Sequence, residues 1–304
     1  MSSEFNRDCW AVVLGGSSGF GLATAQKLAE RGMNLCIVHR DLRGAMRRIE
    51  PEFEKIRGTG AALLSFNADA LKPDKREEIL DALAEEMGED GRVRVLLHSI
   101  ASGNLKLVAP ERPVPKPDRA EVAAKLARSL GAEPEQVRAA IDQLFGEGAA
   151  ALQALATAPE YPSRSYLDEE DLSRTVHSMG TSLLGWAQAL LRRGLFAQDA
   201  RVFGLTSEGN ALAWKGYAAV SAAKAALESL SRSMAVEFAP YGIRSNVIQA
   251  GVSDTPALRA IPGSEHLKAQ ALGRNPFGRL TTPRRTRHEE WRGMTPISRW
   301  WIML

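Results

Sequence analysis

The sequence predicts an α/β fold in which a doubly wound parallel sheet carries helices on both faces. Three observations lead to this prediction. Short apolar runs recur along the chain, segments with helical spacing separate them, and the first run ends in a glycine-rich stretch. Strands that alternate with helices form βαβ units, and such units build parallel sheets.

The first strand is expected at residues 10–14, an apolar run typical of a strand buried on both faces. A helical pattern follows from Leu22 to Ala29 and ends at Gly32. Later strands are expected at residues 35–38, 62–66, 93–98, 201–205 and 243–248. Helices are expected between the second and third strands and at residues 75–87, 167–193 and 217–238.

Composition agrees with an ordinary folded protein. The 304 residues are 44% hydrophobic and 25% charged, which suits a packed core. The net charge of +3 gives no reason to expect a nucleic-acid partner. No apolar run is long enough to span a bilayer and no signal core opens the chain, so we expect no integral membrane segment and a cytoplasmic location. The two Cys and five His show no metal-ligand spacing, so no metal site is predicted.

The alternation of strands and helices breaks between about residue 106 and residue 165. Four prolines open this stretch, and segments with helical spacing around Leu126 and Ile141 follow them. We interpret the stretch as a helical insertion after the fourth strand. It is either a surface decoration or a lid or carrier-binding element, because loops at the carboxyl ends of parallel strands border the ligand crevice.

A glycine-rich loop lies between the first expected strand and the first expected helix, with the sequence Gly15-Gly16-Ser17-Ser18-Gly19-Phe20-Gly21. Glycines let the backbone turn tightly and approach a phosphate, and the free N–H groups of a helix N-terminus attract negative charge. The spacing is GxxxGxG rather than GxGxxG. It predicts dinucleotide binding by a single Rossmann-type domain at residues 1–283. The alternative is a glycine-rich turn without a ligand.

The end of the second strand is expected to select the cofactor. The chain reads His39-Arg40-Asp41 at this point. A basic residue there suits the 2′-phosphate of NADP, whereas an acidic residue favours the ribose hydroxyls of NAD. Arg40, with Arg43 as a second cation nearby, predicts NADP. Asp41 keeps NAD open as the alternative.

Tyr217 and Lys224 lie on the expected helix at residues 217–238, with six residues between them. This offset is about two helical turns, so both side chains share one face. Together with the glycine loop, the pair resembles the short-chain dehydrogenase/reductase family. Most members carry Tyr-x3-Lys, but the matching position here is Val220, which has no hydroxyl. Tyr-x6-Lys is the pattern of the enoyl-acyl carrier protein reductases within this family.

Further features resemble the same branch. After the fourth strand the chain reads His98-Ser-Ile-Ala101 instead of Asn-Ala-Gly, and residues 105–209 contain no Asn for the proton relay of carbonyl-reducing members. Residues 246–255 are similar to the segment that lines nicotinamide and pyrophosphate in enoyl reductases. The resemblance implies a cofactor site formed by Gly15, Ser17, Ser18, Gly19, Phe20, Gly21, His39, Arg40, Asp69, Ala70, Ser99, Ile100, Ala101, Lys224, Gly251, Val252, Ser253 and Thr255.

The resemblance also implies a chemistry. A hydride would pass from NADPH to the β-carbon of a 2-enoyl thioester on acyl carrier protein or CoA, as in fatty acid biosynthesis. Tyr217 would hydrogen-bond the thioester oxygen and stabilise the enolate. Lys224 would bind the nicotinamide ribose hydroxyls, and its charge would favour ionisation of the Tyr217 phenol. A homo-oligomer, by family resemblance a tetramer, is expected.

Ser207 keeps a second chemistry open. It lies ten residues before Tyr217, where enoyl reductases often carry an aromatic residue. It also lies thirteen residues before Val220, which is the Ser-to-Tyr separation of carbonyl-reducing members. Ser207 is therefore a third candidate catalytic residue, and reduction of a 3-ketoacyl thioester or another ketone is the alternative. A non-catalytic NADP-binding scaffold is the alternative from another class of function.

The resemblance ends at residues 275–283. Residues 284–304 hold five Arg and three Trp, with no helix or strand period. We interpret this atypical segment as the product of a shifted reading frame or a truncated gene model. The alternative is a genuine basic, aromatic tail for a partner or a membrane surface. In the first case the predicted sheet lacks the family's last edge strand.

Overall fold

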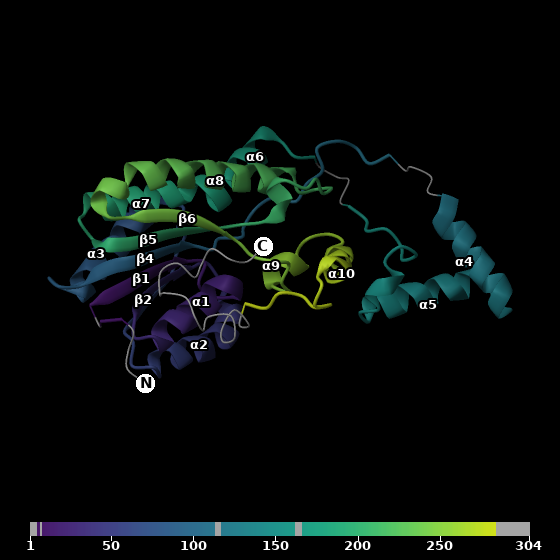
Figure 1. The fold of residues 1–304 in the computed structure, drawn as a ribbon, viewed down its shortest axis with the longest axis horizontal. Coiled ribbons are helices and arrows are strands. Elements are labelled where there is room, and N and C mark those ends of the chain that lie inside the picture. The colour runs from purple at the N-terminus through teal and green to yellow at the C-terminus, as the bar shows by residue number, and fades with distance from the viewer. Residues whose placement is uncertain (1–4, 7, 113–116, 162–165, 284–304) are drawn as a thin grey trace.

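The computed structural model describes residues 5–6, 8–112, 117–161 and 166–283, with only the backbone described at residues 117 and 118. Figure 1 shows a twisted sheet with helices above and below it, and a helical arm beside it. The predicted tail at residues 284–304 lies outside the described residues, as do the prolines at positions 113 and 115.

The described part of the chain forms a six-stranded sheet in the order β3-β2-β1-β4-β5-β6, and every neighbouring pair is parallel. The strands are β1 (Cys9–Leu14), β2 (Asn34–His39), β3 (Leu63–Asn67), β4 (Arg92–His98), β5 (Phe196–Thr206) and β6 (Arg244–Gln249). The order reverses direction between β1 and β4, and open sheets bind ligands at the carboxyl ends of the strands beside such a point. The predicted doubly wound fold is confirmed.

Two core layers hold the helices to the sheet. Successive β1 residues point to opposite faces: Trp10, Val12 and Leu14 pack with one cluster, Ala11 and Val13 with the other. The first cluster contains residues of α3 (Pro73–Met87), α7 (Ser182–Arg192) and α8 (Ala218–Glu237), and the second those of α1 (Gly19–Glu30) and α2 (Arg43–Arg57). A strand covered on both sides explains the continuous apolar run at residues 10–14.

β5 begins at Phe196, five residues before the expected start at 201. Polar residues such as Asp199 interrupt the apolar pattern and hide the first part of the strand. The Asp199 carboxylate accepts hydrogen bonds at 2.7 Å from Arg94 of β4 and at 2.6 Å from Arg244 of β6. The arginines of the neighbouring strands therefore satisfy the Asp199 carboxylate. Pairing with β4 extends β5 back to Phe196, beyond its apolar residues.

The expected helix at 167–193 is interrupted. It consists of α6 (Glu169–Val176), the π-helical turn η2 (His177–Thr181) and α7. A Cβ on Gly180 would lie 2.5 Å from the carbonyl oxygen of Ala223 on α8, so the two backbones touch at this glycine. The interruption follows from this close approach, which helical spacing alone does not reveal.

The insertion contains α4 (Pro117–Leu130), α5 (Pro134–Gly146) and the 3₁₀ turn η1 (Ala150–Leu152). Figure 1 draws α4 and α5 beside the sheet rather than over it. Val137, Ile141 and Phe145 pack in a separate apolar cluster that includes Ala269 of α10 (Ser264–Arg274). The insertion thus contacts the region after β6, where α9 (Pro256–Arg259) and α10 follow the last strand of the described residues.

None of the helices in the described ranges combines the length and apolarity needed to cross a bilayer.

Candidate active site

A cleft with a cavity volume of about 540 Å³ lies at the carboxyl ends of the strands. The loops after β1, β2, β3 and β4 form one wall, and α8 with the segment after β6 forms the other. Its lining includes the predicted site residues Gly15, Ser17, Ser18, Gly19, Phe20, His39, Arg40, Asp69, Ala70, Ser99, Ile100, Ala101, Tyr217, Lys224 and Thr255. The cleft lies where the strand order reverses, and its volume is within the usual range for small-molecule sites.

Two glycines of the loop, Gly15 and Gly21, lie too close to neighbouring backbone to carry a side chain. Gly15 has a φ of +82°, and a Cβ there would lie 2.7 Å from the carbonyl oxygen of Ser99. A Cβ on Gly21 would lie only 2.2 Å from the carbonyl oxygen of Gly15. The loop then enters α1 at Gly19, and no acidic side chain lies in the first turn of that helix. This cradle of backbone at a helix N-terminus fits the pyrophosphate of a dinucleotide.

At the end of β2, the structure gives Arg40 and Asp41 different surroundings. These are the two side chains proposed to contact the adenosine ribose. His39 is buried, and its Nδ1 lies 3.0 Å from the carboxylate of Asp41. The Asp41 backbone also exchanges two hydrogen bonds with the side chain of Asn67. Arg40 stays exposed, with a guanidinium nitrogen 3.3 Å from Asp69. Because the Asp41 carboxylate faces His39, Arg40 is the more accessible charged side chain at this strand end.

Tyr217 directly precedes α8, whose first helical residue is Ala218. Its hydroxyl lies 3.4 Å from the hydroxyl of Ser207, which follows β5. Ser207 also caps the short 3₁₀ turn that begins at Glu208 by accepting from Gly209 N–H at 3.3 Å. The structure therefore brings two of the three predicted catalytic side chains together, although Ser207 itself does not line the cleft.

Lys224 lies two turns further along α8 and is only 5% exposed. Its ammonium group donates a 3.2 Å hydrogen bond to the carbonyl oxygen of Met179, in the π-helical turn η2. Val220, at the Tyr-x3-Lys position, is buried in an apolar cluster with Met179 and Ala223. Tyr217, directly before α8, is accordingly the tyrosine that lines the cleft beside Lys224.

Burial dominates the electrostatics of this pair. It lowers the pKa of Lys224 from 10.5 to about 8, because the charged ammonium loses its water. Burial also raises the pKa of Tyr217, and the hydrogen bond from Ser207 offsets this only in part. The effect of the Lys224 charge on the Tyr217 phenol stays a prediction, because burial and the Ser207 hydrogen bond are the influences on its pKa that the structure shows.

Replacing Lys224 with Met is expected to stabilise the protein at pH 7, because the native state then no longer holds a buried charge. Between about pH 8 and pH 10.5 the unfolded lysine keeps its proton while the native lysine loses it, so wild-type stability rises with pH. The advantage of Lys224→Met should shrink there by about 1 kcal/mol per pH unit. Urea unfolding of both proteins across this range measures the difference.

The exposed Lys125 offers a matched control, since its ion pair with Glu121 lies on the surface. Lys125→Met should show no such dependence on pH. A stability difference between wild type and Lys224→Met that stays constant across the window would contradict a buried, depressed lysine.

Some predicted cofactor residues lie behind the cleft wall. Gly21 supports the loop through its contact with Gly15, as described above. Gly251, Val252 and Ser253 do not line the cleft. A Cβ on Gly251 would lie 2.3 Å from the hydroxyl of Thr281, whose backbone N–H donates to the carbonyl of Val252 at 3.1 Å. Residues near 281 therefore fold against this segment.

The cleft also contains residues that the sequence did not single out. Met179 and Ser102 come from the π-helical turn and the loop after β4, and Leu205 and Thr206 come from the end of β5. Pro256, Ala257 and Ala260 line the cleft from α9 and its end. Of these residues, only those at the carboxyl end of β5 could have been predicted, because the ends of parallel strands border the cleft. The others are apolar or backbone contributions that carry no chemical signature in the sequence.

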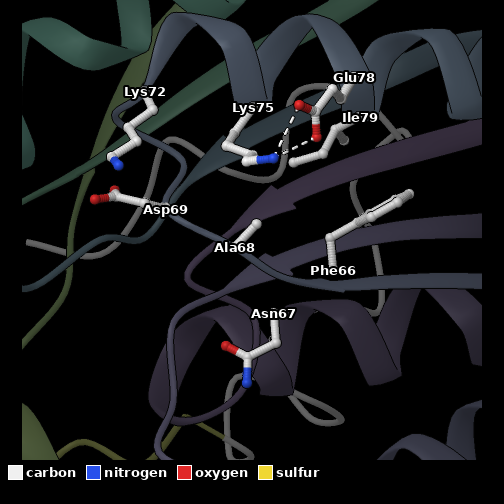
Figure 2. A pocket seen from close by; sticks show the side chains of 8 residues that line it. All are labelled: Phe66, Asn67, Ala68, Asp69, Lys72, Lys75, Glu78 and Ile79. Carbon is white, nitrogen blue, oxygen red and sulfur yellow. Dashed lines mark hydrogen bonds and ion pairs between the residues drawn. The ribbon is translucent and has the colours of Figure 1, made fainter.

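A second cavity, of about 510 Å³, lies between β3 and α3. Figure 2 shows its side chains, with the Lys75 ammonium bonded to both carboxylate oxygens of Glu78 at 2.8 and 2.7 Å. It shares Ala68 and Asp69 with the cleft, but the two candidate catalytic side chains on α8 line only the cleft. The chemistry-bearing groups therefore gather in the cleft.

Within the ranges that the structure describes, no three His, Cys, Asp or Glu side chains come together in a way that could hold a metal ion.

Two family models match the sequence. Residues 9–114 match the model described as short chain dehydrogenase, and residues 119–288 match the one described as Enoyl-(Acyl carrier protein) reductase. The split falls at the insertion, so the second match contains the helical arm, the candidate pair on α8 and the segment after β6.

Similar proteins include both reductases and dehydrogenases. An enoyl-[acyl-carrier-protein] reductase [NADH] of Streptomyces avermitilis is 31% identical over 264 residues, which are 83% of this chain and 62% of that protein. The chain therefore spans less than two thirds of that relative's length. A cis-4-hydroxycyclohexanecarboxylate dehydrogenase of Sinomonas cyclohexanicum is 26% identical over 90% of this chain and 84% of its own.

The fold matches solved structures as well. A short chain dehydrogenase of Burkholderia cenocepacia, in complex with NADP, superposes with a TM-score of 0.60 at 19% identity, covering 92% of this chain and 88% of that one. The second family model alone matches more than half of the residues. The protein belongs to the short-chain dehydrogenase/reductase family of oxidoreductases.

Proposed function

We propose that this protein uses NADPH to reduce the 2,3 double bond of an enoyl thioester carried by acyl carrier protein or CoA. One observation carries the proposal. Tyr217 and Lys224 line the same cleft seven residues apart, while Val220, at the position of the more common tyrosine, is 3% exposed in an apolar cluster. The enoyl reductase model that covers α8 and the name of the Streptomyces relative support the same substrate class.

The bound nicotinamide would supply the hydride. Tyr217 would donate its hydroxyl to the thioester oxygen and stabilise the negative charge that develops there. Its raised pKa keeps the phenol protonated at neutral pH, which suits a donor. Lys224 would hold the nicotinamide ribose hydroxyls with the ammonium hydrogens that the Met179 carbonyl does not take. The glycine loop and the start of α1 would hold the pyrophosphate.

Ser207 favours a second candidate, the reduction of a ketone. A hydroxyl 3.4 Å from the catalytic phenol resembles the pair with which carbonyl-reducing members polarise their substrate oxygen. The dehydrogenase relative from Sinomonas supports this alternative by name. The absence of Asn from residues 105–209 argues against it, because the carbonyl-reducing members usually carry an Asn there as part of a proton relay.

A comparison of two thioesters tests the proposal. The protein is mixed with NADPH and crotonyl-CoA, and separately with NADPH and acetoacetyl-CoA, and the absorbance of the reduced nicotinamide is followed. Loss of absorbance with crotonyl-CoA is expected. Turnover of the ketone alone would replace the proposal with the second candidate, and cofactor binding without turnover of either thioester would indicate a scaffold.

Arg40 is proposed to select NADP. Arg40→Asp should weaken NADPH binding about 10- to 100-fold, because a charge-assisted contact to the 2′-phosphate is lost, and should leave NADH binding little changed. Fluorescence titration with both cofactors measures the ratio. Arg47→Ala removes an exposed cation of α2 that does not line the cleft, and it should leave both affinities unchanged. Equal losses for NADPH and NADH in Arg40→Asp would exclude this role.

The insertion is proposed to cover the acyl chain. Tyr161, at its returning end, lies beside Gly216, where a Cβ would approach the ring to 3.6 Å, and Lys215 lies 5.8 Å from the ring centre. Lys215 is also bonded to Glu111 at the outgoing end. Both ends of the insertion therefore meet at the loop before Tyr217.

We further propose that residues 1–283 act as one NAD(P)-binding domain and that the protein works as a homo-oligomer.

A further inference from the structure

His98, the last residue of β4, is a buried side chain to which the proposed chemistry gives no role. It is 0% exposed, and its Nε2 lies 2.9 Å from the hydroxyl of Ser182 at the start of α7. Its Nδ1 is buried without a hydrogen-bond partner in the described part of the chain. A buried polar atom without a partner is unfavourable, so a histidine kept here needs a reason.

The hydrogen bonds around Ser182 determine how the imidazole is protonated. The Ser182 hydroxyl donates to the carbonyl oxygen of Ser178 at 3.2 Å, which uses its single hydrogen. We assign the proton of the neutral ring to Nε2, because the Ser182 hydroxyl, which donates to Ser178, then accepts from His98. Burial, and next the charge of Lys224, lower the pKa of His98 to about 3. The ring is a permanently neutral donor across the physiological range.

The hydrogen bond from His98 holds Ser182, the residue that directly follows the π-helical turn η2. The N–H of Ser182 donates to the carbonyl of His177, five residues earlier, which defines the π-helical spacing. Ser178 in the same turn bonds through its hydroxyl to the carbonyl of Ser102, in the loop after β4. The turn is thus tied twice to β4 and the loop that follows it.

The other side of the same turn faces α8. Gly180 allows the backbone of η2 to touch the carbonyl of Ala223, and the Met179 carbonyl accepts from Lys224 at 3.2 Å. In the described residues this carbonyl is the hydrogen-bond acceptor of the buried ammonium group. The position of η2 therefore decides whether Lys224 keeps that partner.

We infer that His98 is a positioning residue for Lys224, because it holds the π-helical turn that presents the Met179 carbonyl to the ammonium group. His98 itself does not line the cleft. The expected effect on NADPH affinity rests on the proposed role of Lys224 in cofactor binding. The hydrogen bonds that hold the turn do not depend on which reaction the protein catalyses.

A pair of substitutions separates the hydrogen bond from packing. His98→Phe keeps a ring of similar size and removes the donor. His98→Gln places an amide N–H near the former Nε2 and restores it. Ser182→Ala removes the acceptor while leaving His98 in place, and it decides the matter if His98→Phe does not fold. Ser231→Ala is the matched control, since it deletes a buried hydroxyl on a different helix, α8, where Ser231 is bonded to Ser245 at 2.9 Å.

Two readouts avoid any dependence on turnover. The first is the pKa of Lys224, from NMR of protein labelled with ¹³C at the lysine ε-carbon, with Lys224→Met to assign the signal. The second is NADPH affinity by fluorescence at pH 6 and pH 7. The titratable groups that face this site are Tyr217 on α8, His98 on β4 and His177 in η2. A His177→Gln background removes the exposed histidine from the pH profiles.

In His98→Phe and Ser182→Ala the pKa of Lys224 should fall by about one unit, because the ammonium loses a charge-assisted hydrogen bond. NADPH affinity should fall about two-fold at pH 7, where half of the lysine has then lost its proton, and stay nearly unchanged at pH 6, where the lysine is still protonated. His98→Gln should restore both values. The inference is overturned if these variants lower the melting temperature as Ser231→Ala does but leave the lysine pKa at its wild-type value. Should the wild type fail to bind NADPH, the proposed function fails while the NMR readout still tests the positioning.

Discussion

Tyr217→Phe is expected to reduce kcat for the enoyl thioester about 100- to 1,000-fold while NADPH affinity stays within about two-fold of wild type. The hydroxyl is the group that would face the thioester oxygen, and its partner in the described residues is Ser207 at 3.4 Å. The ring itself is held by packing. A Cβ on Gly209 would lie 2.3 Å from it, and it packs against the cluster that contains Val220. Phenylalanine can therefore occupy the same place.

Two further variants sharpen the Tyr217 experiment. Tyr241→Phe removes an exposed phenol hydroxyl outside the cleft and should leave kcat nearly unchanged. Ser207→Ala distinguishes the two reductions, since a ketone reductase would lose as much rate as in Tyr217→Phe, whereas an enoyl reductase would lose much less. Full activity of Tyr217→Phe, or a collapse of its NADPH affinity, would contradict the assigned role.

Gly21→Ala is expected to weaken NADPH binding about 100-fold and to lower the free energy of unfolding by about 2–4 kcal/mol. The added Cβ would lie 2.2 Å from the carbonyl oxygen of Gly15, which is backbone and has little room to yield. The loop between Gly15 and Ser18 must then move away from the start of α1. Since the backbone of this loop forms the proposed phosphate cradle, stability and cofactor binding should fall together.

Gly44→Ala is the control for Gly21→Ala. Gly44 lies in the first turn of α2 with nothing within 4 Å of its added Cβ. The substitution should leave NADPH binding unchanged and raise stability by about 0.5 kcal/mol, because alanine loses less backbone entropy on folding. Urea unfolding and fluorescence titration of both variants provide the comparison. Normal cofactor affinity in Gly21→Ala would show that the loop does not cradle the phosphates.

The fold was largely predictable because its signals are local. Apolar runs such as residues 10–14 mark strands buried on both faces, and the glycine loop marks the turn into the first helix. Errors arose where partners outside the segment decided the outcome. The strand expected at 201–205 leaves out residues 196–200, although Arg94 and Arg244 on the neighbouring strands pair with Asp199 and β5 continues through it.

The candidate site was predictable to a different depth at each position. Tyr217 and Lys224 follow from helical spacing, and their presence on one wall of the cleft agrees with it. The contributions of Met179 and His98 do not follow, because a backbone carbonyl and a buried imidazole act through contacts with distant segments. The raised pKa of Tyr217 does not follow from the sequence either, since burial of a side chain is a property of the packed molecule.

By itself, the sequence determined the parallel sheet, the glycine loop and the pair of residues on α8, because spacing along a strand or helix decides which side chains share a face. Only the tertiary structure decided which groups are buried, that the Asp41 carboxylate faces His39, and that a π-helical turn meets Lys224. These features depend on the distance between segments far apart in the chain. Desolvation and hydrogen bonding depend on which of these segments pack together in the folded molecule, and no local sequence pattern encodes that packing.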